Sequence, residues 1–143
     1  MNGSTSGLVV LAVLTMGMDG GTERATARLR VRGLEDARGV VECVLWAGSN
    51  GFPRETTKAL TKTTARPVGT EATCVFEELP PGRYAISFIH DRNEDGKMNT
   101  GLFGMPLERY GFSRDPKPFM RAPTFDEAAF QLEASSELSA TAR

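Results

Sequence analysis

The chain has 143 residues and carries 17 basic and 18 acidic side chains, for a net charge of −1. This length predicts a single domain. The near-zero charge, without a lysine or arginine cluster, excludes the strong positive field typical of nucleic-acid-binding proteins, so we expect no nucleic-acid partner. The 15 glycines and 8 prolines predict frequent turns.

The N-terminal segment differs from the rest of the chain. Residues 7–18 (GLVVLAVLTMGM) are mostly apolar, too short for the roughly 20 residues that span a bilayer but typical of the hydrophobic region of a signal peptide. A small-x-small motif follows at Ala25-Thr26-Ala27. We therefore predict that residues 1–24 are a signal peptide or apolar leader, with cleavage near Ala27. The mature chain, residues 25–143, would be a single exported domain, periplasmic or extracellular, with no transmembrane span.

Short segments of alternating apolar and polar residues begin after this leader and predict β-strands. In residues 25–34 the apolar residues would face the core and the arginines would face water. Residues 40–47 form the second predicted strand, in which Trp46 should be half exposed or covered by a loop. Residues 54–60 are expected to form one or two helical turns, and residues 61–69 a polar connection.

Two further strands flank a strong turn signal. Residues 70–79 and 83–90 show the same alternation and are predicted strands. In the second of them, the side chains expected to face the core begin with Tyr84 and end with His90. Between them, proline presets φ and glycine accepts positive φ, so a tight turn is predicted at Pro80, Pro81 and Gly82.

The segment 91–123 lacks a regular period, and stretches of this length are usually functional or folded on their own side chains. Its aromatic residues favour an ordered loop packed on the domain; the alternative is a sugar- or peptide-binding surface. These aromatics are Phe103, Tyr110, Phe112 and Phe119. Residues 126–132 are then predicted as a strand and 133–143 as a frayed edge strand. The expected fold is all-β: a single Greek-key β-sandwich of about seven strands with a long ordered loop.

Four pieces of the sequence carry a family resemblance: LPPGRYA, HDRNEDGKMNT, FGMPLERYGFS and APTFDEAAF, in this order. Together they resemble a bacterial family of exported proteins called domain of unknown function 2141. The resemblance implies a transthyretin-like or prealbumin-like sandwich, and it implies no activity because the family is uncharacterised. Loop and turn residues with structural roles are expected within these pieces at Pro80, Pro81, Gly82, Tyr84, Gly96, Gly104, Pro106, Tyr110, Gly111 and Phe112.

One of these pieces resembles the first half of a calcium-binding loop. Side-chain oxygens recur at alternate positions and Gly96 permits a sharp turn. The candidate Ca²⁺ ligands are Asp91, Asn93, Asp95, the Lys97 carbonyl and Asn99. The acid expected at the twelfth position is replaced by Leu102. The alternative is that the polar side chains only cap their own backbone.

The single histidine, His90, cannot build a His-rich zinc or copper site. One interpretation is structural: His90 would close the end of the core. The alternative is a small hydrolase, for example one that acts on carbohydrates, in which His90 would work with Glu94, Asp95 or Glu108. A pocket joining these groups would favour the enzyme. No nucleophile motif is present, so we favour a binding or structural module with an unknown envelope protein or glycan as partner.

The two cysteines, Cys43 and Cys74, both fall on inward faces of predicted strands. A disulfide requires Cα atoms about 4.4–6.8 Å apart, whereas facing sheets lie roughly 10 Å apart. Pairing across the sandwich would therefore require the strands to bend inward. Both outcomes, a disulfide and two buried thiols, remain open at this point.

Overall fold

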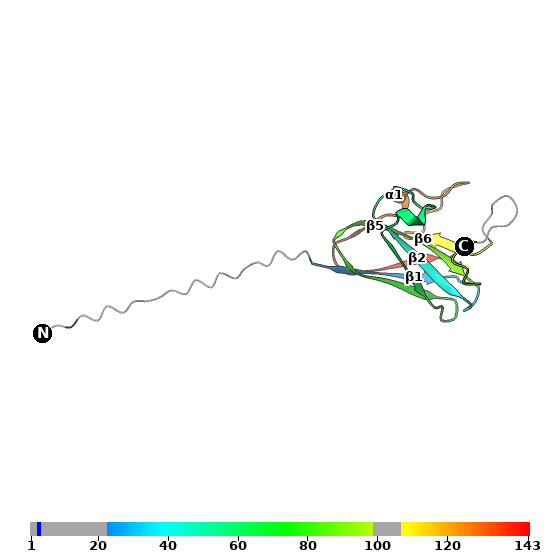
Figure 1. Cartoon of the computed structure of the whole chain (residues 1–143), viewed down its shortest axis with the longest axis horizontal. Coiled ribbons are helices and arrows are strands. Elements are labelled where there is room, and N and C mark those ends of the chain that lie inside the picture. Colours follow the sequence, from blue (N-terminus) through cyan, green and yellow to red (C-terminus); the bar gives the residue numbers. More distant parts are fainter. Residues whose placement is uncertain (1–2, 4–22, 99–106) are drawn as a thin grey trace.

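The computed structural model describes residues 3, 23–98 and 107–143, which form a two-sheet β-sandwich (Figure 1). The strands are β1 (Ala25–Arg32), β2 (Val40–Trp46), β3 (Thr61–Ala65), β4 (Ala72–Leu79), β5 (Gly82–Asp91), β6 (Tyr110–Phe112), β7 (Phe130–Leu132) and β8 (Ser136–Thr141). The other elements are a 3-10 turn, η1 (Thr56–Lys58), and a short helix, α1 (Phe125–Ala128). The all-β prediction is confirmed, and the described residues contain eight strands where about seven were expected.

The two sheets have different sizes. The smaller has the order β4-β1-β8, and the larger has the order β3-β2-β5-β6, with β7 paired to the beginning of β5. All pairs are antiparallel except β1 and β8, which run parallel from Ala27↔Ser136 to Arg32↔Thr141. Within the described residues, no helix is long and apolar enough to cross a bilayer. Nearly all of the predicted leader, residues 1–24, lies outside the described residues.

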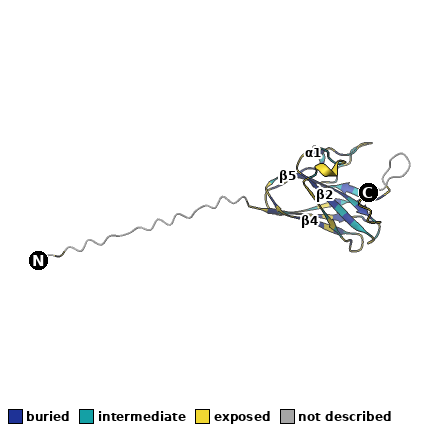
Figure 2. Cartoon of the chain, viewed as in Figure 1, coloured by how far each residue is buried: buried dark blue, intermediate teal, exposed yellow. Residues whose placement is uncertain are grey.

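The main core lies between the sheets, and its buried residues come from β1, β2, β4, β5, β7 and β8 (Figure 2). In β1 the side chains of Ala27, Leu29 and Val31 are fully buried, while the intervening arginines are exposed. This matches the period-two prediction for that segment, because successive side chains of a strand point to opposite faces.

A disulfide between Cys43 of β2 and Cys74 of β4 crosses this core. The two Cα atoms are 6.4 Å apart, well below the roughly 10 Å that separates packed sheets. The sheets therefore approach each other at this point, and the bridge ties one to the other.

A second, smaller cluster covers part of the outer face of the larger sheet. Trp46 is buried there beside Phe125, and its ring meets Phe52 edge-on with centroids 5.3 Å apart. The indole N–H donates to Ser87 Oγ at 2.9 Å. Trp46 is thus covered by loops, one of the two placements that the sequence predicted.

Three predicted elements need correction. The segment 61–69, predicted as a connection, contains β3, whose exposed threonines pair with β2 along a sheet edge and so show no apolar period. The segment 91–123 contains β6. The predicted strand 126–132 begins instead as α1, because Thr124 and Glu127 form a reciprocal capping box; only Phe130–Leu132 is extended.

The C-terminal segment is also better ordered than predicted. Strand β8 pairs with β1 over six residues, and Ala140 and Ala142 are buried in the core. The backbone of Arg143 exchanges two hydrogen bonds with Tyr110 of β6. The strand is an edge strand, as expected, but it is not frayed, because backbone pairing compensates for its lack of large apolar side chains.

Candidate functional site

A groove runs over the outer face of the larger sheet beside the second cluster, which contributes Val44 to its floor. Its floor consists of two rows of outward-facing side chains that pair across β2, β5 and β6. These rows are Val44–Ser87–Phe112 and Glu42–Ile89–Tyr110. Their alternate neighbours in the strands face the main core, so strand geometry alone directs the floor residues outward.

The walls of the groove come from loops that are distant in sequence. One wall is the proline-rich segment formed by residues 115–118 and 120–123, together with Pro53 and Arg54. Residues 96–98 line the groove as well. The volume of this open hollow is about 1190 Å³. We call this hollow, floor and walls together, the sheet groove. A smaller hollow of about 540 Å³ adjoins it and shares Pro53 and Arg54.

Basic side chains outnumber acidic ones around the sheet groove. The basic residues that line it are Arg54, Lys97, Lys117, Arg121 and Arg143, and the acidic ones are Glu42 and Asp115. Asp115 is engaged within the fold, because its carboxylate accepts the backbone N–H of Thr141 at 2.8 Å. Arg121 is engaged as well, with Glu127 at 2.8 Å. The pKa of Glu127 is lowered to about 2, mainly by the hydrogen bond from Arg121 and, to a smaller extent, by the one from the Thr124 N–H.

Two large apolar side chains lie exposed beside the groove. Phe119 is 89% exposed and Met120 is 88% exposed. Met120 also has a φ of 57°, a left-handed conformation that side chains disfavour. The prediction that Phe119 packs on the sandwich is therefore wrong. Tyr110 and Phe112, by contrast, do pack on it as part of β6.

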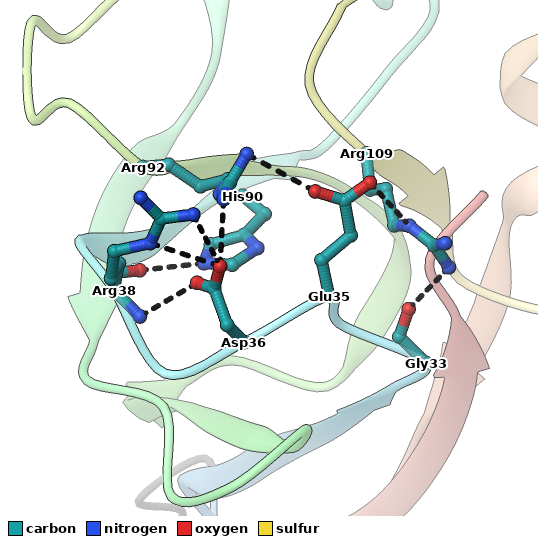
Figure 3. Close-up of polar contacts among 7 residues, drawn as sticks. All are labelled: Gly33, Glu35, Asp36, Arg38, His90, Arg92 and Arg109. Carbon is teal, nitrogen blue, oxygen red and sulfur yellow. Dashed lines mark hydrogen bonds and ion pairs between the residues drawn. The ribbon is translucent and has the colours of Figure 1, made fainter.

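The single histidine lies elsewhere, in a polar corner at the end of β5 (Figure 3). His90 is fully buried, and its Nε2 lies 2.7 Å from the Arg38 carbonyl. A carbonyl only accepts, so Nε2 carries the proton. Within the described part of the chain, Nδ1 has no hydrogen-bond partner.

Ion pairs close this corner toward solvent. Asp36 accepts from Arg92 at 2.7 Å, and Glu35 lies between Arg92 and Arg109 (Figure 3). The backbone N–H of Arg38, together with its guanidinium, holds the pKa of Asp36 below its ordinary value. The corner is thus a hydrogen-bonded cap over the turn before β2.

Comparison with known proteins identifies a family but no characterised relative. Residues 29–139 match the family described as "Uncharacterized protein conserved in bacteria (DUF2141)". The chain belongs to the DUF2141 family. No curated protein and no solved structure matches it, so a transthyretin-like relationship stays a prediction.

The carboxylates considered for hydrolysis are dispersed in this DUF2141 domain. Glu94 is exposed and pairs with Arg66 at 3.4 Å, whereas Glu108 is buried. Asp95 is exposed on the turn that follows β5. His90 lines neither hollow found among the described residues. The described residues therefore show no pocket that joins the histidine to these acids.

The predicted calcium ligands are engaged in organising their own turn. The buried Asp91 carboxylate accepts the backbone N–H groups of Asp95 at 3.2 Å and Gly96 at 2.7 Å. Asp95 in turn accepts from the Asn93 amide at 3.1 Å and the Lys97 N–H at 2.8 Å. In the described part of the chain, His, Cys, Asp and Glu form no group of three able to hold a metal. Asn99 lies outside the described residues, and calcium binding stays a prediction.

The predicted turn residues have clear structural roles where they are described. Pro80, Pro81 and Gly82 join β4 to β5, and the Tyr84 hydroxyl donates to the Pro80 carbonyl at 2.6 Å. Gly96 has a φ of 71°. In β6, a Cβ on Gly111 would collide with the Phe88 ring. The other two, Gly104 and Pro106, lie outside the described residues.

The sequence did not identify the sheet groove of this DUF2141 domain. The groove joins residues 42, 44, 54, 96–98, 115–118, 120–123 and 143, which only the fold brings together. One signal was available: the outward side of β5 carries Ala85 and Ile89. A strand that is apolar on both faces indicates that something covers each of them.

Proposed function

We propose that this chain is an exported binding module that receives a partner in the sheet groove and works in the periplasm or outside the cell. The sequence supports export through the apolar run at residues 7–18. The Cys43–Cys74 bridge supports the same compartment, since disulfides persist in oxidising surroundings and are rare in the cytosol.

The observation that carries the binding role is the sheet groove itself. A hollow of about 1190 Å³ with exposed apolar side chains at its edge is the kind of surface that marks a binding site. The histidine required by the hydrolase alternative lies buried elsewhere. A binding module therefore accounts for more of the structure than a catalyst does.

Cell fractionation and mass spectrometry of the native protein test the compartment. We expect an envelope or extracellular protein without Met1 and without free thiols. Ala25 and Ala27 are buried and begin the pairing of β1 with β4, so cleavage near Ala27, as the sequence predicted, would remove the start of β1. We therefore expect the cleavage site to lie before Ala25. A cytoplasmic protein with an intact Met1 and two reduced cysteines would overturn this part of the proposal.

Site-specific photocrosslinking in living cells tests the groove. A photoreactive side chain at Lys117 faces the groove, and the same group at Arg28, exposed on the opposite sheet, serves as the control. We expect a discrete adduct from position 117 that excess unlabelled protein competes away, and none from position 28. Equal adducts from both positions, or none from either, would contradict a groove-bound partner.

A further inference from the structure

Positive charges are in excess around the sheet groove, although the chain as a whole is nearly neutral. The chain as a whole has a net charge of −1. Yet Arg54, Lys97 and Lys117 line the groove and, among the described residues, make no ion pair. The acidic residues that line the groove, Glu42 and Asp115, are fewer than its basic residues, so the groove carries a positive net charge. The groove is therefore complementary to a negatively charged ligand.

Exposed apolar side chains at the edge of the groove indicate that the ligand also carries an apolar group. Met120 lines the groove and Phe119 precedes it in the chain. Both are almost fully exposed, and Met98, which also lines the groove, is 39% exposed. Aromatic, methionine and arginine side chains are enriched at protein interfaces, and methionine adapts to varied partners. An anionic polysaccharide would satisfy the cations but leave Phe119 and Met120 in water.

The shape of the groove constrains the size of the ligand. Its volume of about 1190 Å³ exceeds the roughly 300–1,000 Å³ of small-molecule pockets. Loop residues lie beside a floor that is only two side-chain rows wide. A single extended chain can lie along it.

We propose that the sheet groove binds an extended acidic segment of another protein, with an apolar side chain of that segment seated against Phe119 and Met120. This inference rests on the proposed function of the groove as a binding site. Acidic side chains of the segment pair with Arg54, Lys97 and Lys117. The partner is thereby defined by two features together, negative charge and an apolar anchor.

Fluorescence anisotropy with labelled probes tests the proposal on the chain as the cell produces it, with its disulfide intact. The probes are short peptides of glutamate interspersed with leucine, of glutamate with serine and of lysine with leucine, and a labelled dextran sulfate. The groove variants are Lys117→Glu and Met120→Ser. Their matched controls are Arg28→Glu on the opposite sheet and Val68→Ser, which is 84% exposed outside the groove.

We expect the glutamate–leucine peptide to bind more tightly than the other peptides, and less tightly as salt is raised. Lys117→Glu should weaken it about threefold to fivefold, and Met120→Ser roughly fivefold or more. The controls should bind like the parent. Thermal unfolding of each variant verifies that the fold is intact.

Three results would overturn the inference. The first is that the glutamate–leucine peptide does not bind, and the second is that Arg28→Glu weakens its binding as much as Lys117→Glu does. The third is that dextran sulfate binds in a way that Lys117→Glu abolishes and Met120→Ser leaves unchanged. The last result would assign the groove to an anionic polysaccharide. In each case crosslinking from position 117 reports separately on the proposed function. If the adduct from position 117 persists, only the inference of an acidic segment is refuted, and the groove remains a binding site. If the adduct is absent, the proposed function of the groove is refuted as well.

Discussion

Reduction of the Cys43–Cys74 bridge should cost this domain a large share of its stability. The bridge closes a loop with a sequence separation of 31 residues. In the chain-entropy description, closing such a loop removes about 12 cal/mol/K from the unfolded chain, which corresponds to about 3.7 kcal/mol at 25 °C. Whole domains are stable by only about 5–15 kcal/mol, so the reduced protein should be marginal.

Urea unfolding of the oxidised and reduced parent protein measures this effect without changing any side-chain volume in the core. We expect the midpoint to fall on reduction and the melting temperature to drop by roughly 10–20 °C. The denaturant slope should increase, because the reduced unfolded chain is less compact and exposes more surface. A Cys43→Ala/Cys74→Ala variant should be at least as unstable as the reduced parent and indifferent to reductant.

Coincident unfolding curves for the oxidised and reduced protein would refute the reasoning. They would mean either that the cysteines do not pair or that the unfolded chain already brings β2 and β4 together. Thiol titration of the unfolded, unreduced protein separates these two explanations, since only the first leaves two reactive thiols.

Three other perturbations test separate parts of the structure. Ser113→Ala leaves a buried N–H of β5 and a buried carbonyl of α1 unpartnered, so urea unfolding should show a loss of about 2–4 kcal/mol; a loss near zero would contradict this role. Asp91→Ala removes the acceptor of two backbone N–H groups and should cost about 1–3 kcal/mol even in chelator. Calcium binding predicts, in addition, that millimolar Ca²⁺ raises the melting temperature of the parent but not of this variant, and an unchanged parent would refute it. Glu127 has its pKa lowered from 4.5 to about 2, so its stabilising contribution is complete above pH 4.5 and is lost as the pH falls through about 2; Arg121→Gln should move this pKa back toward 4.5 in an NMR titration, and an unmoved pKa would refute the pairing.

The sequence predicted those strands that bury one face and expose the other. Strand β1 is the clearest case, because the buried residues Leu29 and Val31 alternate with exposed arginines. The same reasoning failed for β3 (Thr61–Ala65), which exposes side chains on both faces and is fixed by its pairing with β2. Such a strand has no apolar period to detect.

The site residues show the same limit. The sequence correctly placed His90 at the end of the row of β5 side chains that face the core, because the period-two alternation along the strand determines the face on which each side chain lies. The sheet groove, in contrast, depends on where the loops near residues 54, 97 and 117 meet in space. That meeting is a property of tertiary structure, and spacing along the chain carries no information about it.

The parallel pairing of β1 with β8 also affects how the chain is made. Its first rung joins Ala27 to Ser136, so the smaller sheet cannot close until the ribosome has synthesised more than a hundred residues beyond its central strand. Contacts between such distant segments form late and slowly. During translation the growing chain therefore lacks its final architecture until its last strand, β8, has been made.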